Sequence, residues 1–335
     1  MKQIRDYPYY FLIFGILSLQ VLLIFPHVLA GSQHSVPDYR IIALNSDSLE
    51  ALRILGAQSM VVGVSGMTVK EPLLREEIAG LPVVGEWNEP GYEKIYSLRP
   101  DLVLTYKNYP GPELEKKLRG INILRLDLYK PSTLAEEIRA LGKTVHREDK
   151  AESFIHWYRK ELAEIRARVR NATRSPTVYM ESYSPCQALG PGSGGYEMCN
   201  LAGGKNISST VSIPYPSITS EWILTKQPEI IVKAALIGGY SERSNTLLKD
   251  LRQKMINRPG WKKIKAVKNK RVLVLASDIC TGPGAIVGIA YMARWFYPEE
   301  CADLNPERIH RQYLKKFQGI DYRGCYTWPP PGVNL

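Results

Sequence analysis

A short pattern occurs twice in this chain, at positions 93–104 and 221–232. Each copy begins with a Glu, has a Pro followed by an acidic residue at the same distance, and ends in an apolar run. The residue before a Pro is disfavoured in the α region, so each copy predicts a short helix that stops at Arg99 or Gln227. The apolar run that follows is typical of a parallel strand covered on both faces. A unit repeated far along the chain predicts two similar α/β lobes.

The remaining apolar runs extend this pattern into an alternation of strands and helices. Such alternation predicts parallel, doubly wound sheets. Helices are expected over residues 46–56, where Ser and Asp residues supply N-cap candidates, and over residues 132–141. The further predicted strands are 39–45, 61–64, 81–85, 121–126, 177–180 and 272–275.

One long helix is predicted between the lobes, from about Glu148 to Arg170. Its apolar residues keep the three-, four- and seven-residue spacing of a single helical stripe, and they are Ala151, Phe154, Ile155, Tyr158, Leu162, Ile165 and Val169. A continuous helix shared by both lobes resists wide closure, unlike a flexible hinge. The predicted fold is therefore α/β, with two Rossmann-like lobes of parallel sheet joined by one long helix. The expected organisation is 1–30 signal peptide or anchor, 38–146 N-terminal lobe, 147–171 connecting helix, 172–320 C-terminal lobe and 321–335 surface tail.

The N-terminus has the pattern of an export signal. Lys2 and Arg5 precede an apolar stretch from Tyr9 to Ala30, and Val28-Leu29-Ala30 fits a cleavage site. The stretch is also long enough to span a bilayer, for which about 20 residues suffice, so a retained membrane anchor is the alternative. Both interpretations predict an extracytoplasmic protein, periplasmic or at the cell surface. Mass spectrometry of the mature N-terminus distinguishes them.

Charge and cysteine content narrow the function classes. The net charge is +11, but an exported protein without a basic run interleaved with aromatic residues is not expected to bind nucleic acid. The densest basic segment, 262–271, is interpreted as a solvated loop. The chain has five cysteines without Cys-x-x-Cys spacing, so no zinc site is expected, while one disulfide remains open among Cys186, Cys199, Cys280, Cys301 and Cys325. Asn171 and Asn206 fit the glycosylation pattern.

Several segments, in order and spacing, resemble the class III substrate-binding proteins of ABC importers, which capture ferric siderophores, haem, cobalamin and some oxyanions. The resemblance covers about residues 40–300. The matching segments are 40–44, 55–57, 61–65, 81–85 with the first repeat copy, 200–206, 215–216 with the second copy, 259–261 and 266–274.

The resemblance implies a function and a partner. It implies a receptor that delivers an iron complex (siderophore or haem) or a corrinoid to an ABC permease. In the family, one Glu of each lobe docks onto permease Arg residues, and Glu93 and Glu221 occupy the matching positions. A carboxylate in the first turn of an exposed helix is favoured by the helix dipole and pairs well with Arg. Without a partner, the same carboxylates would simply stabilise helix ends.

Ligand-binding candidates follow from the fold, because open α/β sheets bind ligands beyond the carboxyl ends of their strands. The residues after the predicted strands are rich in aromatic side chains, which suit a bulky metal complex, and Lys107 and Arg243 could pair with an anionic chelate. Ordinary packing at strand ends is the alternative for each Tyr, and helix capping is the alternative for Asp278. The predicted ligand-binding residues are Trp87, Tyr106, Lys107, Tyr183, Tyr240, Arg243 and Asp278.

Other functions remain as alternatives. An oxyanion-binding protein of the same fold, for molybdate or tungstate, would favour Ser, Lys and backbone donors over aromatics. An anchored adhesion or signalling module is a further alternative. An enzyme is not expected, because no nucleophile elbow, His-Glu-x-x-His or paired catalytic acids appear. No cofactor and no metal site are expected, and the Gly-rich segment 190–195 is interpreted as a turn over the cleft rather than a phosphate loop.

Overall fold

Two sheets organise the described part of the chain. The computed structural model describes residues 39–71, 73–74 and 78–333, and the chain from Tyr39 onward forms one compact unit. The predicted signal peptide or anchor, 1–30, lies outside the described residues. The first sheet has the strand order β2-β1-β3-β4, and all its pairings are parallel. Its strands are β1 (Ile41–Ala43), β2 (Val61–Val64), β3 (Leu102–Thr105) and β4 (Asn122–Arg125).

The second sheet has the order β6-β5-β7-β8-β9. Its first four strands run parallel, and β9 pairs with β8 in the antiparallel sense. The two-lobed α/β fold predicted from the alternation of elements is confirmed, with one antiparallel edge strand added. The strands are β5 (Thr177–Glu181), β6 (Lys205–Asn206), β7 (Ile230–Ala235), β8 (Val272–Ala276) and β9 (Thr327–Trp328).

The two copies of the repeated pattern occupy equivalent places in the two sheets. Each supplies a short helix followed by a central strand: α3 (Tyr92–Ser97) before β3, and α8 (Ser220–Lys226) before β7. The residue before each Pro is left-handed rather than extended, with φ of 46° at Arg99 and 45° at Gln227. A left-handed residue is a common way to end a helix, because it lets the following amides bond back to the last turn.

Two predictions about irregular segments are wrong. Residues 81–85 do not form a strand; Val83 makes only an isolated bridge to Val64, and Pro82 has no amide hydrogen to donate. The end of the chain was predicted as a surface tail, 321–335. Instead Thr327 is 1% exposed and pairs with Leu275 in the second sheet.

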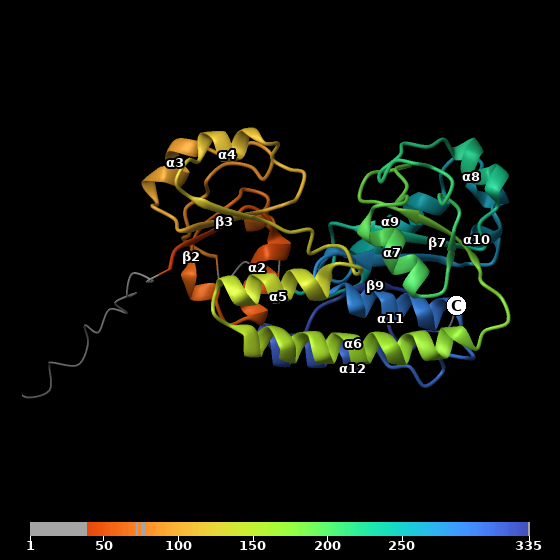
Figure 1. Cartoon of the computed structure of the whole chain (residues 1–335). Coiled ribbons are helices and arrows are strands. Elements are labelled where there is room, and N and C mark those ends of the chain that lie inside the picture. Colours follow the sequence, from red (N-terminus) through yellow and green to blue (C-terminus); the bar gives the residue numbers. More distant parts are fainter. Residues whose placement is uncertain (1–38, 72, 75–77, 334–335) are drawn as a thin grey trace, which may run out of the picture. The chain divides into compact units, whose positions relative to one another are not determined.

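The long helix predicted between the lobes is α6 (Glu148–Arg170). It packs against α2 (Ser46–Ile54) and α5 (Leu134–Thr144) of the first lobe and against α11 (Ala285–Phe296) of the second. Figure 1 shows it as one unbroken helix. At 1.5 Å per residue, a helix of 23 residues is about 35 Å long.

The buried face of α6 joins the cores of the two lobes. Phe154 is fully buried and contacts Trp157, Tyr158 and Phe317 with ring centroids 5.2–6.0 Å apart. One hydrophobic cluster contains these residues together with side chains from both sheets.

The remaining helices are α4 (Glu113–Lys117), α7 (Gly194–Leu201), α9 (Thr246–Ile256), α10 (Lys265–Lys268) and α12 (Pro306–Tyr313), which continues as a π-helix (Leu314–Gln318).

Cysteine, metal and membrane features are simple in the described part of the chain. All five cysteines lie there and none forms a disulfide. Among residues 39–71, 73–74 and 78–333, no group of three or more His, Cys, Asp and Glu side chains is arranged to hold a metal ion. No helix within these same ranges has the length and apolar character needed to span a membrane. Asn206 is 2% exposed and bonds the carbonyl of Leu189, so the folded protein hides this glycosylation pattern.

A core substitution tests the role of α6. Phe154→Ala removes a fully buried ring between the lobes and should reduce the free energy of unfolding by about 3–5 kcal/mol. Urea denaturation followed by far-ultraviolet circular dichroism measures this change. Lys160→Ala, on the exposed face of the same helix, is the matched control and should change stability by less than about 0.5 kcal/mol. A loss below 1 kcal/mol for Phe154→Ala would contradict the packing described here.

Candidate functional site

A cavity of about 440 Å³ lies at the carboxyl ends of strands from both sheets. Its walls come from the residues after β1, β2, β3 and β4 in the first lobe, and from the residues after β5 and β8 together with the end of β7 in the second. Open α/β sheets place ligands at this edge, where loops diverge from the strand ends. The lining residues include Asp47, Met67, Trp87, Tyr106, Tyr109, Asp127, Tyr129, Tyr183, Gln187, Gly194, Tyr215 and Cys280.

Aromatic side chains dominate one side of this cavity. Trp87 makes edge-to-face contacts with Tyr106 and Tyr109 at centroid distances of 5.7 and 5.6 Å. Tyr106 makes a further edge contact of 5.7 Å with Tyr129. Tyr183 and Tyr215 come from the other lobe and are partly exposed. The cavity therefore offers broad apolar faces with hydroxyl groups at their edges, a surface suited to a large ligand with mixed polarity.

The charged groups that line the cavity are carboxylates. Asp47, in the first turn of α2, is 4% exposed and accepts a hydrogen bond of 3.3 Å from the Tyr106 hydroxyl. Burial, with a smaller contribution from the nearby Asp127, raises the pKa of Asp47 to about 6 even though hydrogen bonds from Tyr106 and Thr281 lower it. No Lys or Arg lines this cavity among the described residues. Asp127 is paired with Lys130 at 2.8 Å. The site thus favours ligands that are neutral or cationic where they meet Asp47.

A second acidic group lies beside the cavity, around a small void of about 20 Å³. Asp47 and Glu50 of the first lobe face Asp278 of the second there, with Glu71 on the same void. Burial raises the pKa of Asp278 to about 6 and that of Glu71 to about 7. It also raises the pKa of Glu50 well above its usual range, even though the Tyr313 hydroxyl donates to its carboxylate.

Three of the seven predicted ligand-binding residues line the cavity: Trp87, Tyr106 and Tyr183. Lys107 and Asp278 do not. Lys107 pairs with Glu137 at 2.5 Å, which turns its charge toward α5, and Asp278 accepts the amide hydrogen of Tyr240 at 2.8 Å.

Tyr240 and Arg243 also lie outside the cavity lining. Tyr240 is 9% exposed and packs under Arg323, whose guanidinium lies 4.2 Å from the ring centroid. Arg243 is exposed on the loop after β7. Both follow strand β7 in the sequence, but the loop after β7 turns away from the cavity at Gly238 and Gly239, which have φ of 87° and 90°.

The sequence predictions missed Asp47, Tyr129, Tyr215 and Cys280. Tyr129 follows the correctly predicted strand β4, so extending the strand-end rule to that strand would have found it. Asp47 was interpreted only as a helix-capping candidate, whereas the structure gives the capping bond to Asn45, whose side chain accepts the amide of Ser48. Tyr215 follows no strand, so the rule gives no signal for it.

The Gly-rich segment forms part of the wall where the two lobes touch. Ser193 caps α7 by accepting the amide of Tyr196, and Gly194 and Gly195 line the cavity. A Cβ at Gly194 would collide with the carbonyl oxygen of Tyr129 in the other lobe, so only glycine allows this approach. The segment predicted as a turn over the cleft is therefore an ordered contact between the lobes.

The two repeated acids lie on the outer surface. Glu93 and Glu221 are both exposed in the first turns of α3 and α8. Neither forms an ion pair with any residue that the structure describes. Figure 1 shows α3 and α8 on different lobes, each on the side away from α6.

Comparison with known proteins identifies the family. Residues 41–279 match the periplasmic binding protein family. The chain is a member of this family. A vitamin B12-binding protein from Vibrio cholerae serotype O1 is 26% identical over 277 residues, which cover 81% of this chain and 92% of that protein. The resemblance to substrate-binding proteins noted in the sequence is thereby confirmed at the level of the family.

Solved structures of other periplasmic binding proteins share the fold. A molybdate periplasmic binding protein of a Haemophilus influenzae ABC transporter superposes with a TM-score of 0.73 at 19% identity, covering 87% of this chain and 96% of that one. A periplasmic heme binding protein from Pseudomonas aeruginosa gives a TM-score of 0.63 at 24% identity, covering 78% and 93%. At these identities the likeness concerns the fold alone. These relatives are binding proteins rather than enzymes.

The raised pKa of Asp47 predicts a pH-dependent difference in stability. At pH 7.5 the buried carboxylate of this periplasmic binding protein is ionised, and Asp47→Asn should increase the free energy of unfolding by roughly 1–3 kcal/mol. The folded state binds more protons than the unfolded state between about pH 4 and 6, so the wild type gains stability from this group as the pH falls. The gain from the substitution should therefore shrink toward pH 4.5 and below.

Chemical denaturation of both ligand-free proteins between pH 4.5 and 7.5 measures the difference. Comparing the wild type with Asp47→Asn cancels the effect of all other titrating groups. One of these is buried His310, whose pKa is lowered to about 3 by burial, so that it destabilises the folded state as the pH falls below 6.5. A constant difference across this pH range would contradict the raised pKa of Asp47.

Proposed function

We propose that this chain is an extracytoplasmic receptor that binds a bulky metal chelate, either a corrinoid or an iron complex such as haem or a ferric siderophore, and delivers it to an ABC permease. The observation that carries this proposal is the gathering of one Trp and five Tyr side chains around one cavity at the strand ends of both lobes. Planar macrocycles present large apolar faces, and aromatic side chains cover such faces at little entropic cost.

The charge of the cavity favours a corrinoid within this group. Asp47 lines the cavity, Asp127 is already paired with Lys130 at 2.8 Å, and no Lys or Arg in the described part of the chain lines it. The carboxylates of haem or of an acidic siderophore therefore meet no cation on the cavity wall. Corrinoids carry amide side chains that hydrogen-bond to carboxylates and hydroxyls. The vitamin B12-binding relative from Vibrio cholerae supports the same choice.

Oxyanion capture is the second candidate, supported by the fold of the molybdate-binding protein. An oxyanion requires several N–H donors or cations directed at one point. The cavity presents aromatic rings and acids instead, so this candidate is less favoured.

An extracytoplasmic location follows from the N-terminal pattern, which lies outside the described residues, and from the family to which the chain belongs.

Ligand titration tests the proposal directly. Cyanocobalamin added to the full chain should quench Trp fluorescence and bind with a dissociation constant in the micromolar range or below. Trp87→Ala should weaken this binding at least tenfold, because it removes the ring at the centre of the aromatic group. Trp222→Ala, on α8 outside the cavity, is the matched control and should bind normally.

Isothermal titration with hemin, a ferric siderophore and molybdate completes the set. Binding of molybdate alone would replace the proposal by oxyanion capture. Absence of binding to all four ligands would contradict it.

Docking has a separate prediction. Charge reversal by Glu93→Lys or Glu221→Lys should reduce uptake of labelled ligand more than tenfold in cells, while the dissociation constant of the purified protein changes by less than twofold. The reason is that both carboxylates are exposed, lack ion-pair partners among the described residues and lie outside the cavity. Glu136→Lys, in the first turn of α5, is the control and should leave uptake intact. If affinity falls together with uptake, these acids do not serve docking.

A further inference from the structure

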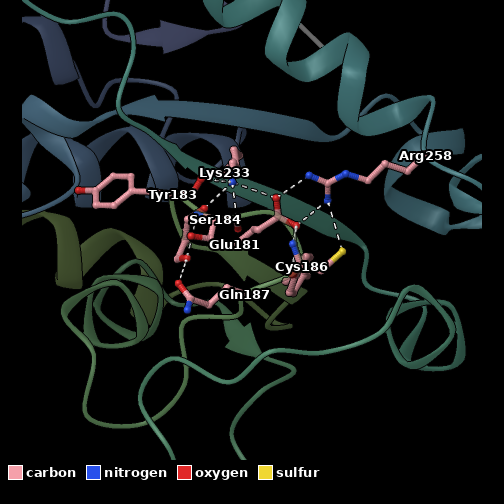
Figure 2. Close-up of polar contacts among 9 residues, drawn as sticks. Glu181, Tyr183, Ser184, Cys186, Gln187, Lys233 and Arg258 are labelled. Atoms are coloured by element: carbon pink, nitrogen blue, oxygen red, sulfur yellow. Dashed lines mark hydrogen bonds and ion pairs between the residues drawn. The ribbon is translucent and has the colours of Figure 1, made fainter.

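The second lobe contains a buried ionic group that no predicted function uses. Glu181, the last residue of β5, is 0% exposed, and it lies beside Lys233 of β7 in the register of the sheet. Its carboxylate contacts Lys233 Nζ at 3.0 Å and Arg258 Nη1 and Nη2 at 2.6 and 2.9 Å. Figure 2 shows both cations directed at this carboxylate. We call Glu181, Lys233 and Arg258 the Glu181 cluster.

Lys233 connects the cluster to a wall of the cavity. Its side chain is 3% exposed, and Nζ donates to the carbonyl oxygens of Ser182, Tyr183 and Ser184 at 2.5, 3.1 and 3.3 Å. All three of these residues line the cavity. A buried lysine inside an apolar strand is costly unless its charge is paired and its donors are used, and here both conditions are met.

Glu181 fixes the other end of the same wall. Its carboxylate accepts the amide hydrogen of Cys186 at 3.1 Å, where the backbone has a left-handed φ of 54°. Within the wall, Gln187 is tied back to Ser182 by a backbone bond of 2.8 Å and a side-chain bond of 2.5 Å. The cluster therefore holds both ends of the segment 182–187, and this segment carries Tyr183 and Gln187 into the cavity.

Arg258 extends the connection to α8. Its guanidinium lies 4.5 Å from the ring centroid of Trp261, which is fully buried and donates from Nε1 to Ser220 Oγ at 3.2 Å. Ser220 is the first residue of α8, directly before Glu221. A backbone hydrogen bond of 2.9 Å from the amide of Ile218 to the carbonyl of Cys186 connects the wall 182–187 with the residues before α8 a second time.

The first lobe has a simpler counterpart at the equivalent position. Thr105 follows the first copy of the repeat at the same distance as Lys233 follows the second. It is 0% exposed, and its hydroxyl donates to the carbonyl of Tyr109, a cavity residue, at 2.7 Å. In both copies of the repeat, the residue directly after the buried apolar run, Thr105 or Lys233, donates hydrogen bonds to backbone carbonyls of a loop that lines the cavity.

From these contacts we propose that Glu181, Lys233 and Arg258 are positioning residues, which fix the cavity wall 182–187 and the start of α8 as one rigid element. The inference rests on the proposed function, since it assigns ligand contact to this wall and docking to α8. Lys233 holds the cavity wall 182–184 in place, and Arg258, through Trp261, holds the start of α8, which carries Glu221.

Hydrogen–deuterium exchange on the ligand-free full chain tests the Lys233 arm. Lys233→Met should increase amide exchange in residues 182–187 at least tenfold and weaken cyanocobalamin binding at least tenfold. Arg308→Met is the matched control, because it breaks the pair with Glu161, which is 3% exposed in its side chain and remote from the cavity. This control should lower the melting temperature without changing exchange in 182–187. Unchanged exchange in Lys233→Met, or equal increases in both variants, would overturn the proposal.

A double variant separates positioning from simple stabilisation. Glu181→Gln with Lys233→Met removes the buried carboxylate together with Lys233, and the partly exposed Arg258 can still donate to the Gln side chain. We therefore expect the double variant to fold even if the single variant unfolds. Recovery of the melting temperature with exchange in 182–187 still raised supports positioning. Recovery of both the melting temperature and the wild-type exchange rates in 182–187 would show that the cluster contributes to stability alone.

Arg258→Gln tests the other arm. It should increase exchange in residues 218–222 and reduce cellular uptake, with cyanocobalamin affinity changed by less than threefold. Unchanged exchange in 218–222 would remove α8 from the proposed element. Because exchange is measured without ligand, it decides the positioning role even if no tested ligand binds, an outcome that would contradict the proposed function instead.

Discussion

The structure depends on one continuous helix that is buried by two lobes at once. Phe154, Ile155 and Ile165 of α6 contribute to a single hydrophobic cluster that contains side chains from both sheets. Neither lobe could separate widely from the other without exposing part of this cluster, at a cost of about 25 cal/mol per Å² of apolar surface. Polar contacts add to the connection, because Glu197 accepts from both the amide and the hydroxyl of Ser132 across the lobes. A binding protein built in this way presents a largely preformed cavity.

Much of the fold could be predicted from periodicity and from the repeat. The apolar stripe from Ala151 to Val169 gave the bounds of α6 because helix period and burial coincide there. The wrong predictions, a strand at 81–85 and a surface tail at 321–335, concern segments whose structure depends on contacts with distant parts of the chain. Residues 81–85 are as apolar as a strand, yet Pro82 cannot donate to a ladder, and the Pro-rich end of the chain pairs at Thr327 because β8 offers a free edge.

The candidate site was predictable in part for a similar reason. The strand-end rule found Tyr106 and Tyr183 because β3 and β5 are regular and the loops leave them directly. Trp87 also lines the cavity, although the residues before it form only isolated bridges. The rule failed for Lys107, whose ammonium is drawn to the buried acid Glu137, and for Tyr240, because two left-handed glycines turn the preceding loop away. It also could not predict that no Lys or Arg of the described residues lines the cavity, because this depends on which side chains the folded chain turns away from it.

Gly194 has a consequence for how such a receptor could diversify. The backbone of one lobe meets the carbonyl of Tyr129 in the other at a position where even a methyl group does not fit. The separation of the lobes at this point is therefore bounded by main chain rather than by side chains, and point substitutions cannot narrow it. Adaptation to a differently shaped cargo would instead involve the aromatic rim of the cavity, where Tyr109 and Tyr215 are 57% and 48% exposed.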